Sequence, residues 1–145
     1  MIEIRSATLF DLSFLKETEK RIFRDPWGEG SLQSHFEGAC GTGLILRCHA
    51  EDVGYLISSR ILGEAELLRI AVLPEYRRKG LGEALLTHWL TEEEKAGSTH
   101  FFLEVRSENQ GARALYEKMG FSPVGRREGY YTDPSDDAVL YQLHI

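Results

Sequence analysis

Residues 70–86 read IAVLPEYRRKGLGEALL. The apolar residues that lead into this stretch form a nearly continuous run, which predicts a central strand over 65–73 covered on both faces. Pro74 ends that strand, because proline cannot donate a backbone hydrogen bond. A helix is expected over 82–96, where apolar side chains recur on one side. The stretch is therefore a strand, a basic loop and a helix, in that order.

The loop of this unit has the composition of an anion-binding site. Gly80 and Gly82 let main-chain amides approach a ligand closely, and the amides at a helix start are unsatisfied and carry the positive end of the helix dipole. Arg77, Arg78 and Lys79 add positive charge suited to a diphosphate and to a phosphorylated ribose. A solvated basic turn before an amphipathic helix is the alternative, and for the two glycines alone the two interpretations are evenly balanced.

Two other kinds of phosphate-binding loop do not fit the spacing. A dinucleotide-binding G-x-G-x-x-G loop needs a third glycine at the position that Leu85 occupies. A Walker loop needs G-K-[ST] after a longer glycine spacing, and this sequence lacks that arrangement. The spacing therefore disfavours both dinucleotides and nucleoside triphosphates as ligands.

Strands and helices are expected on both sides of this unit. Hydrophobic patterns predict further strands over 2–5, 44–48, 53–59, 101–105, 124–128 and 138–144. Three more helices are predicted: one after the capping-box-like Thr8 to Asp11, one from a cap at Ser31 through Phe36, and one over 109–119. The first should stop before Pro26, and Glu19 is the one polar residue on its apolar face. We expect residues 1–145 to form a single α+β domain, a mixed, mostly antiparallel central sheet flanked by helices.

Composition and charge narrow the class of protein. The 145 residues are 42% hydrophobic and 28% charged, which is typical of a folded globular chain. A net charge of -6 provides no general attraction for nucleic acid, so direct nucleic-acid binding is not expected. The start of the chain lacks a signal-peptide pattern, and no stretch approaches the roughly 20 apolar residues that cross a bilayer. A cytoplasmic protein without a membrane partner is therefore expected.

Cysteine and histidine spacing predicts no metal site. Cys40 and Cys48 lack a C-x-x-C spacing and an accompanying set of histidines, so ordinary reduced thiols are expected. His49 adjoins Cys48, but neighbours on a strand point to opposite faces. The pattern therefore disfavours a catalytic cysteine nucleophile and favours a mechanism without a covalent enzyme intermediate.

Two segments together resemble the GNAT acetyltransferase superfamily. The RRKGLG of residues 77–82 resembles its Q/R-x-x-G-x-G/A signature, and residues 103–121 resemble its later motif, L-E-V-R-x-x-N-x-x-A-x-x-L-Y-x-x-x-G-F. They span roughly the C-terminal half of the chain. The resemblance implies a GNAT fold and acetyl-CoA as the cosubstrate. The coenzyme-binding residues that it implies are Ile70, Ala71, Val72, Arg77, Arg78, Lys79, Gly80, Leu81, Gly82, Glu83 and Asn109.

Acetyl transfer to an amine needs a base for the ammonium, a donor for the developing oxyanion and a proton for the departing thiolate. Glu104 interrupts an apolar strand, so its side chain either faces a cleft as a base, faces solvent or pairs with an arginine. From the residues alone the last two interpretations are favoured, whereas the resemblance implies the base. Core packing is the ordinary role of Tyr116, and the resemblance implies the general acid. The oxyanion would be held by a main-chain amide of 70–72.

Two other stretches resemble the RimI-type enzymes, GNAT members that acetylate the N-terminal alanine of a ribosomal protein. Pro26-Trp27 resembles their acceptor loop, although Gly28 replaces the usual serine. Residues 126–138 resemble their R-R-x-Y-Y…D-A signature, and residues 141–145 depart from the usual ending. The aromatic residues Trp27, Tyr130 and Tyr131 are expected to wall a peptide groove. The alternative for the two tyrosines is that they only close a hairpin.

The expected function is acetyl transfer to a protein N-terminus, with alanine of a ribosomal protein as the acceptor. An acidic chain also suits a basic ribosomal tail. One alternative is acetylation of a small amine, such as a polyamine or an aminoglycoside. A non-catalytic CoA-binding module is the other, and the presence of both Glu104 and Tyr116 disfavours it, because such a module need retain neither.

Overall fold

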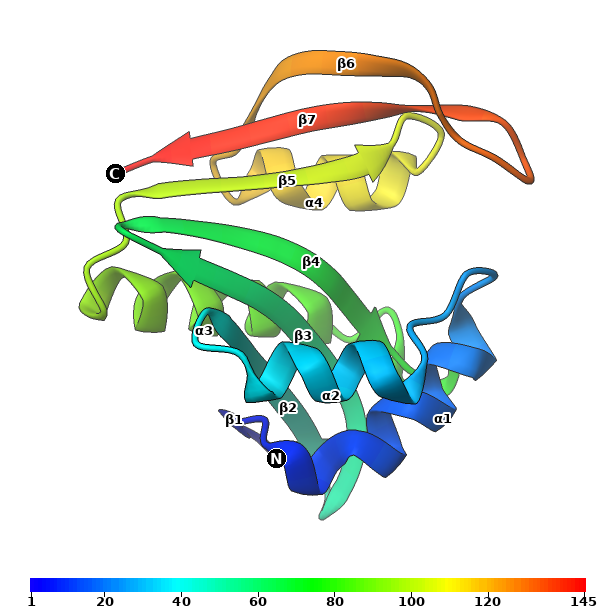
Figure 1. The fold of residues 1–145 in the computed structure, drawn as a ribbon, viewed down its shortest axis with the longest axis vertical. Coiled ribbons are helices and arrows are strands. Elements are labelled where there is room, and N and C mark those ends of the chain that lie inside the picture. The colour runs from blue at the N-terminus through cyan, green and yellow to red at the C-terminus, as the bar shows by residue number, and fades with distance from the viewer.

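A computed structural model describes residues 1–145 and contains one seven-stranded sheet (Figure 1). Its strands follow the order β1-β2-β3-β4-β5-β7-β6, and only β4 and β5 run parallel. The predicted α+β class and the mixed, mostly antiparallel sheet are confirmed. The strand bounds are β1 Ile2–Ser6, β2 Gly41–Cys48, β3 Glu51–Ile61, β4 Glu64–Val72, β5 His100–Arg106, β6 Ser122–Tyr131 and β7 Asp136–His144.

Helices cover both faces of the sheet. The bounds are α1 Leu12–Ile22, α2 Glu29–Glu37, α3 Leu81–Lys95 and α4 Gln110–Lys118. Leu15 of α1 and Leu32 of α2 join one apolar cluster against β2 and β3, whereas Leu85 of α3 and Tyr116 of α4 join another (Figure 1). Two buried layers therefore lie on opposite faces of the sheet. None of the helices combines the length and apolar character needed to cross a membrane.

Some element ends differ from the sequence prediction. Thr8 and Asp11 form the predicted capping box, but it opens a short 3-10 turn before α1 begins. The second helix begins at Glu29 rather than after Ser31, with Gly28 in an extended conformation as its N-cap. Glycine is acceptable at an N-cap, and a glutamate in the first turn is favoured by the helix dipole. Strands β3 and β6 are also longer than predicted.

Strands β4 and β5 pair over only a short length. Residues 64–66 pair with 100–102, and beyond this point the two strands diverge (Figure 1). The remainder of β5 pairs with β7 on its other side. The divergence leaves residues 67–72 of β4 paired with β3 but without a strand neighbour on the β5 side, and α4 lies beside that opening. This break in the sheet positions the candidate site.

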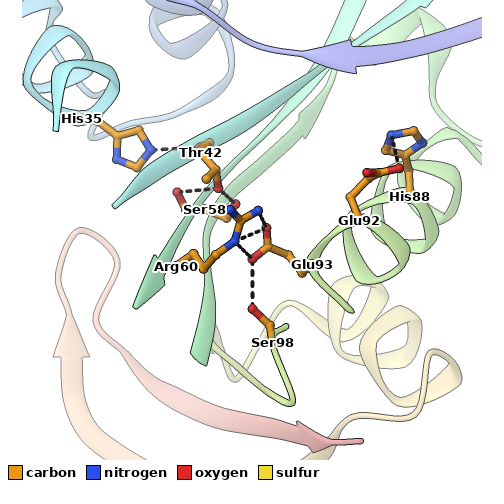
Figure 2. Close-up of polar contacts among 8 residues, drawn as sticks. All are labelled: His35, Thr42, Ser58, Arg60, His88, Glu92, Glu93 and Ser98. Atoms are coloured by element: carbon orange, nitrogen blue, oxygen red, sulfur yellow. Dashed lines mark hydrogen bonds and ion pairs between the residues drawn. The ribbon is translucent and has the colours of Figure 1, made fainter. Parts of the chain in front are cut away.

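Two buried glutamates lie on opposite faces of the sheet. Glu19 of α1 pairs with Arg69 of β4, and Glu93 of α3 pairs with Arg60 of β3. Figure 2 shows the second pair, in which Arg60 donates to both Glu93 oxygens and Ser98 donates to the same carboxylate. A buried carboxylate destabilises the fold unless it is paired, so each arginine offsets a desolvation cost.

Candidate active site

The loop between β4 and α3 has the features of an anion-binding helix start. Gly80 is the N-cap of α3 with a φ of 75°, and no side chain bonds to the amides of the first turn. The first intrahelical bond runs from the Ala84 amide to the Gly80 carbonyl, so the amides before Ala84 have no helical partner. A left-handed φ favours glycine at this position. The main chain of 80–83 therefore offers unpaired amides to an anion such as a diphosphate.

The three basic residues of the loop have different surroundings. Arg77 turns back toward β4, where its Nε donates to the Val72 carbonyl at 2.9 Å. Lys79 places its Nζ 5.4 Å from the centroid of the Tyr76 ring. Arg78 is exposed and has a φ of 64°. Arg77 therefore lines the opening, whereas Arg78 and Lys79 are exposed and do not line it.

A cavity of about 460 Å³ lies between β4 and α4, a size typical of ligand sites. It brings together most of the residues that the family resemblance implies for the coenzyme: Ile70, Ala71, Val72, Arg77, Leu81, Gly82 and Asn109. Asn109 also caps α4, because its Oδ1 accepts from the Ala112 amide at 3.1 Å. The carboxylate of Glu83 instead pairs with Lys118 at 2.6 Å, which leaves only its main chain to serve a diphosphate.

A second cavity of about 360 Å³ adjoins the first. The residues that line both are Phe23, Ile70, Asn109, Ala112 and Tyr116. Its further lining includes Glu104 and Tyr131, together with Asp25, Arg69 and Arg106. The two cavities therefore meet where the predicted base and acid lie. We name them the coenzyme cavity and the acceptor cavity.

Glu104 combines two of the interpretations that its sequence position left open. It lines the acceptor cavity, and its carboxylate also pairs with Arg127 Nε at 3.2 Å. Its side chain is 24% exposed, whereas that of Arg127 is 55% exposed. The neighbouring carboxyl of Glu66 has a raised pKa, because burial and the charge of Glu104 both disfavour its ionised form. Glu104 therefore has one solvent-screened ion-pair partner and keeps access to the cavity.

Tyr116 is both a packing residue and a cavity residue. Its ring contacts those of Phe121 and Tyr141, with centroid separations of 6.2 Å in each case. Burial raises the pKa of Tyr116 well above its ordinary value, and Tyr131 raises it further. The hydroxyl therefore stays protonated at neutral pH, as a general acid requires.

Of the three aromatic residues expected at the acceptor groove, Tyr130 and Tyr131 lie together, with ring centroids 5.0 Å apart, whereas Trp27 lies elsewhere. Tyr131 lines the acceptor cavity, with the Arg106 guanidinium 4.5 Å from its ring centroid. Tyr130 is half exposed at the end of β6, where the hairpin turns. The Trp27 ring packs against His35 and the apolar cluster under α1 and α2, and it lines neither cavity. Phe23 and Asp25 of the same segment occupy the cavity wall instead.

Sequence patterns missed several lining residues. Ile22 and Phe23 end the first helix, while Ala112 and Leu115 lie on α4. Their apolar character was visible, but the meeting of the α1 end with α4 depends on the divergence of β4 and β5. No local pattern signals that divergence.

A larger cavity lies elsewhere, between the β1–β2 edge and α3, with a volume of about 730 Å³. Figure 2 shows its polar residues bonded to one another: Thr42 with Ser58 at 2.5 Å, and Arg60 with Glu93. None of the predicted site residues lines it. These bonds join β2, β3 and α3 across the cavity.

Comparison with known proteins defines the class of enzyme. Residues 12–121 match the Acetyltransferase (GNAT) family. The chain belongs to this family and is an acetyl-CoA-dependent N-acetyltransferase.

Individual relatives match over the whole chain. The ribosomal protein bS18-alanine N-acetyltransferase of Escherichia coli (strain K12) is 38% identical over 147 residues, which cover 100% of this chain and 99% of the relative. The putative bS18-alanine N-acetyltransferase of Bacillus subtilis is 31% identical, with 98% and 95% covered. The crystal structure of the ribosomal-protein-S18-alanine N-acetyltransferase from Escherichia coli has a TM-score of 0.94 and covers 100% of this chain and 94% of that one. These matches confirm the GNAT fold.

Proposed function

We propose that this chain acetylates the N-terminal α-amine of a protein, with the N-terminal alanine of a ribosomal protein as the acceptor. The observation that carries the proposal is the junction of the coenzyme and acceptor cavities at Ile70 and Tyr116, with Glu104 beside it. The names of whole-length relatives support the choice of acceptor. Residues 1–145 would act as one domain, in the cytoplasm, where ribosomal proteins are made.

Coenzyme binding is assigned to the β4–α3 unit and to α4. When bound, acetyl-CoA supplies an acetyl group activated as a thioester. The amides of 80–83 would hold the diphosphate, with Arg78 and Lys79 at the rim. Ile70 and Val72 would flank the pantetheine arm, and Asn109 would contact it from α4. A main-chain amide within 70–72 would donate to the oxygen on which negative charge develops.

Proton transfers are assigned to two residues. The Glu104 carboxylate takes a proton from the α-ammonium of the acceptor, directly or through water, while Arg127 compensates its charge. The neutral amine then forms a bond to the acetyl carbon, and the carbon–sulfur bond breaks. The Tyr116 hydroxyl gives its proton to the departing thiolate. The resulting phenolate takes the second proton of the attacking nitrogen, which leaves a neutral amide, and Glu104 releases its proton to solvent. The products are the N-acetylated chain and free CoA thiol.

A panel of acceptors tests the proposal. Thiol release from acetyl-CoA would be measured with a peptide of the bS18 N-terminus that begins with alanine, with the same peptide already blocked at its α-amine, and with polyamines and aminoglycosides. The proposal predicts turnover with the free peptide and none with the blocked one, and mass spectrometry should place the acetyl group on the alanine. Turnover with small amines alone would contradict the proposed acceptor.

A further inference from the structure

Glu19 is a buried carboxylate that lines neither cavity. Its Oε1 accepts from the Trp27 amide at 2.9 Å and from Arg69 Nε at 3.1 Å. Tyr55 donates its hydroxyl to the other oxygen. The side chain is fully enclosed, so any influence on a ligand must act through these partners.

Arg69 connects this carboxylate to the segment between α1 and α2. Its Nη2 donates to the Asp25 carbonyl at 2.7 Å, and its guanidinium lies 3.9 Å from the centroid of the Phe23 ring. Two of the bonds, at Asp25 and Trp27, involve main-chain atoms of the segment. Because these bonds are to main-chain atoms, Glu19 and Arg69 fix the path of residues 23–27 independently of the side chains that this segment carries.

The fixed segment forms one wall of the acceptor cavity. Phe23, Asp25 and Arg69 all line that cavity. Arg24 of the same segment also contacts the turn between β6 and β7, because its Nη1 donates to the Asp133 carbonyl at 3.1 Å. Figure 1 shows these two segments, distant in sequence, on the same side of the molecule. The position of 23–27 consequently sets one boundary of the space open to an acceptor.

We propose that Glu19 is a positioning residue for acceptor binding. Together with Arg69 it holds residues 23–27 so that Phe23 and Asp25 stand at the acceptor cavity. The inference rests on the proposed function, because it assigns that cavity to a peptide acceptor. Apolar side chains of similar size often stabilise a fold as well as a buried ion pair does. Stability alone therefore does not require the Glu19–Arg69 pair, and its bonds to the main chain of 23–27 give it a further role.

The Glu93–Arg60 pair supplies a matched control. It has the same two side-chain types and a buried carboxylate, but its bonded partners lie on β3, on α3 and at Ser98 (Figure 2). Neither Glu93 nor Arg60 lines the coenzyme or acceptor cavity. Loss of this pair should therefore change stability without changing acceptor binding.

Steady-state kinetics of matched double variants test the proposal. Glu19→Gln with Arg69→Met removes both charges together, so no lone buried charge remains and the protein should fold. The KM for the alanine-starting peptide should rise about tenfold, because small misplacements of positioning groups have large effects, while the KM for acetyl-CoA changes less than about twofold. Glu93→Gln with Arg60→Met should leave both KM values unchanged.

The single Glu19→Gln variant separates positioning from direct contact. Arg69 lines the acceptor cavity, so its replacement in the double variant also removes a cavity side chain, whereas Glu19 does not line the cavity. A raised peptide KM in the Glu19→Gln variant, with an unchanged acetyl-CoA KM, supports positioning. An unchanged peptide KM in both Glu19 variants would overturn it.

Failure of the proposed function is distinguishable from failure of this inference. If the proposed function fails, the wild-type enzyme itself shows no turnover of the peptide. If only this inference fails, the wild-type enzyme acetylates the peptide with the same peptide KM as the variants. Amide hydrogen exchange over residues 23–28 decides the inference in the first case. Faster exchange in the Glu19 double variant than in the Glu93 double variant supports anchoring, and equal exchange contradicts it.

Discussion

The cleft beside β4 and the larger cavity beside α3 both contain a glutamate–arginine pair, but the two pairs differ in how completely they are satisfied. Glu93 receives three bonds from Arg60, at 2.9, 3.2 and 2.5 Å, and a fourth from Ser98. Glu104 has a single ion-pair contact at 3.2 Å to an arginine that is mostly exposed. Size therefore does not identify the reactive site. Groups with unused bonding capacity, at the junction of two cavities, identify it better.

The largest expected difference between the two regions is catalytic. Glu104→Gln should lower kcat by roughly 100-fold, because it removes the proposed base. Glu93→Gln should leave kcat unchanged. Acetyl-CoA affinity, measured by calorimetry, should stay the same in both variants. Equal losses of turnover and coenzyme affinity in Glu104→Gln would mean that Glu104 has a structural role.

Stability should show the opposite order. Glu93→Gln is expected to lower the free energy of unfolding by about 1.5–3 kcal/mol, since buried hydrogen bonds to a charged group are lost. Glu104→Gln should lower it by less than about 1 kcal/mol, because its partner is exposed and solvent screens the pair. Urea unfolding of the two variants measures both values. A larger loss for Glu104→Gln would reverse the comparison.

Two glycines at opposite ends of α3 sharpen the contrast. Gly80 has a φ of 75° and Gly97 a φ of 99°, and an added Cβ would meet no neighbouring atom at either position. Alanine at either site should therefore cost about 1–2 kcal/mol of backbone strain. Only Gly80→Ala, in the coenzyme loop, should also raise the KM for acetyl-CoA. An equal effect of Gly97→Ala would show that general loosening of the helix explains the change.

Alkaline pH gives the smallest expected effect. The acceptor amine loses its proton near pH 8, so kcat/KM should rise toward that pH. The pKa of Tyr116 is raised by burial, so its hydroxyl stays protonated above the ordinary tyrosine value of about 10. The rate should consequently stay level from pH 8 to about 10. A decline within this interval, tracked by thiol release, would argue against Tyr116 as the acid.

The order of strand, basic loop and helix around residues 70–86 is predictable because its signal is local. Strand, proline, basic loop and glycine N-cap follow one another between Ile70 and Gly82, and the observed β4 and α3 follow the same order. Asn109 was likewise visible as the start of a helix. Such features depend on neighbours in sequence, so composition and spacing are sufficient to find them.

The acceptor side depended on tertiary contacts that no local pattern carries. The sequence predicts Trp27 at the peptide groove, yet Phe23 and Asp25 line the cavity, because Glu19 and Arg69 bond to the main chain of this segment. Glu19 was noticeable as the polar residue on an apolar helix face, but its partners lie on β3, β4 and the following loop. A polar residue on an apolar helix face therefore indicates a tertiary contact whose partners the local sequence does not identify.

Titration of the ¹⁵N-labelled protein with CoA, followed by amide chemical shifts, tests most directly whether the cleft is the reaction site. The account predicts the largest shifts at 80–83, at 70–72 and at Asn109, with little change at Thr42, Ser58 and Arg60. Shifts centred on Thr42, Ser58 and Arg60, with none at 80–83, would place the coenzyme in the larger cavity and contradict the account.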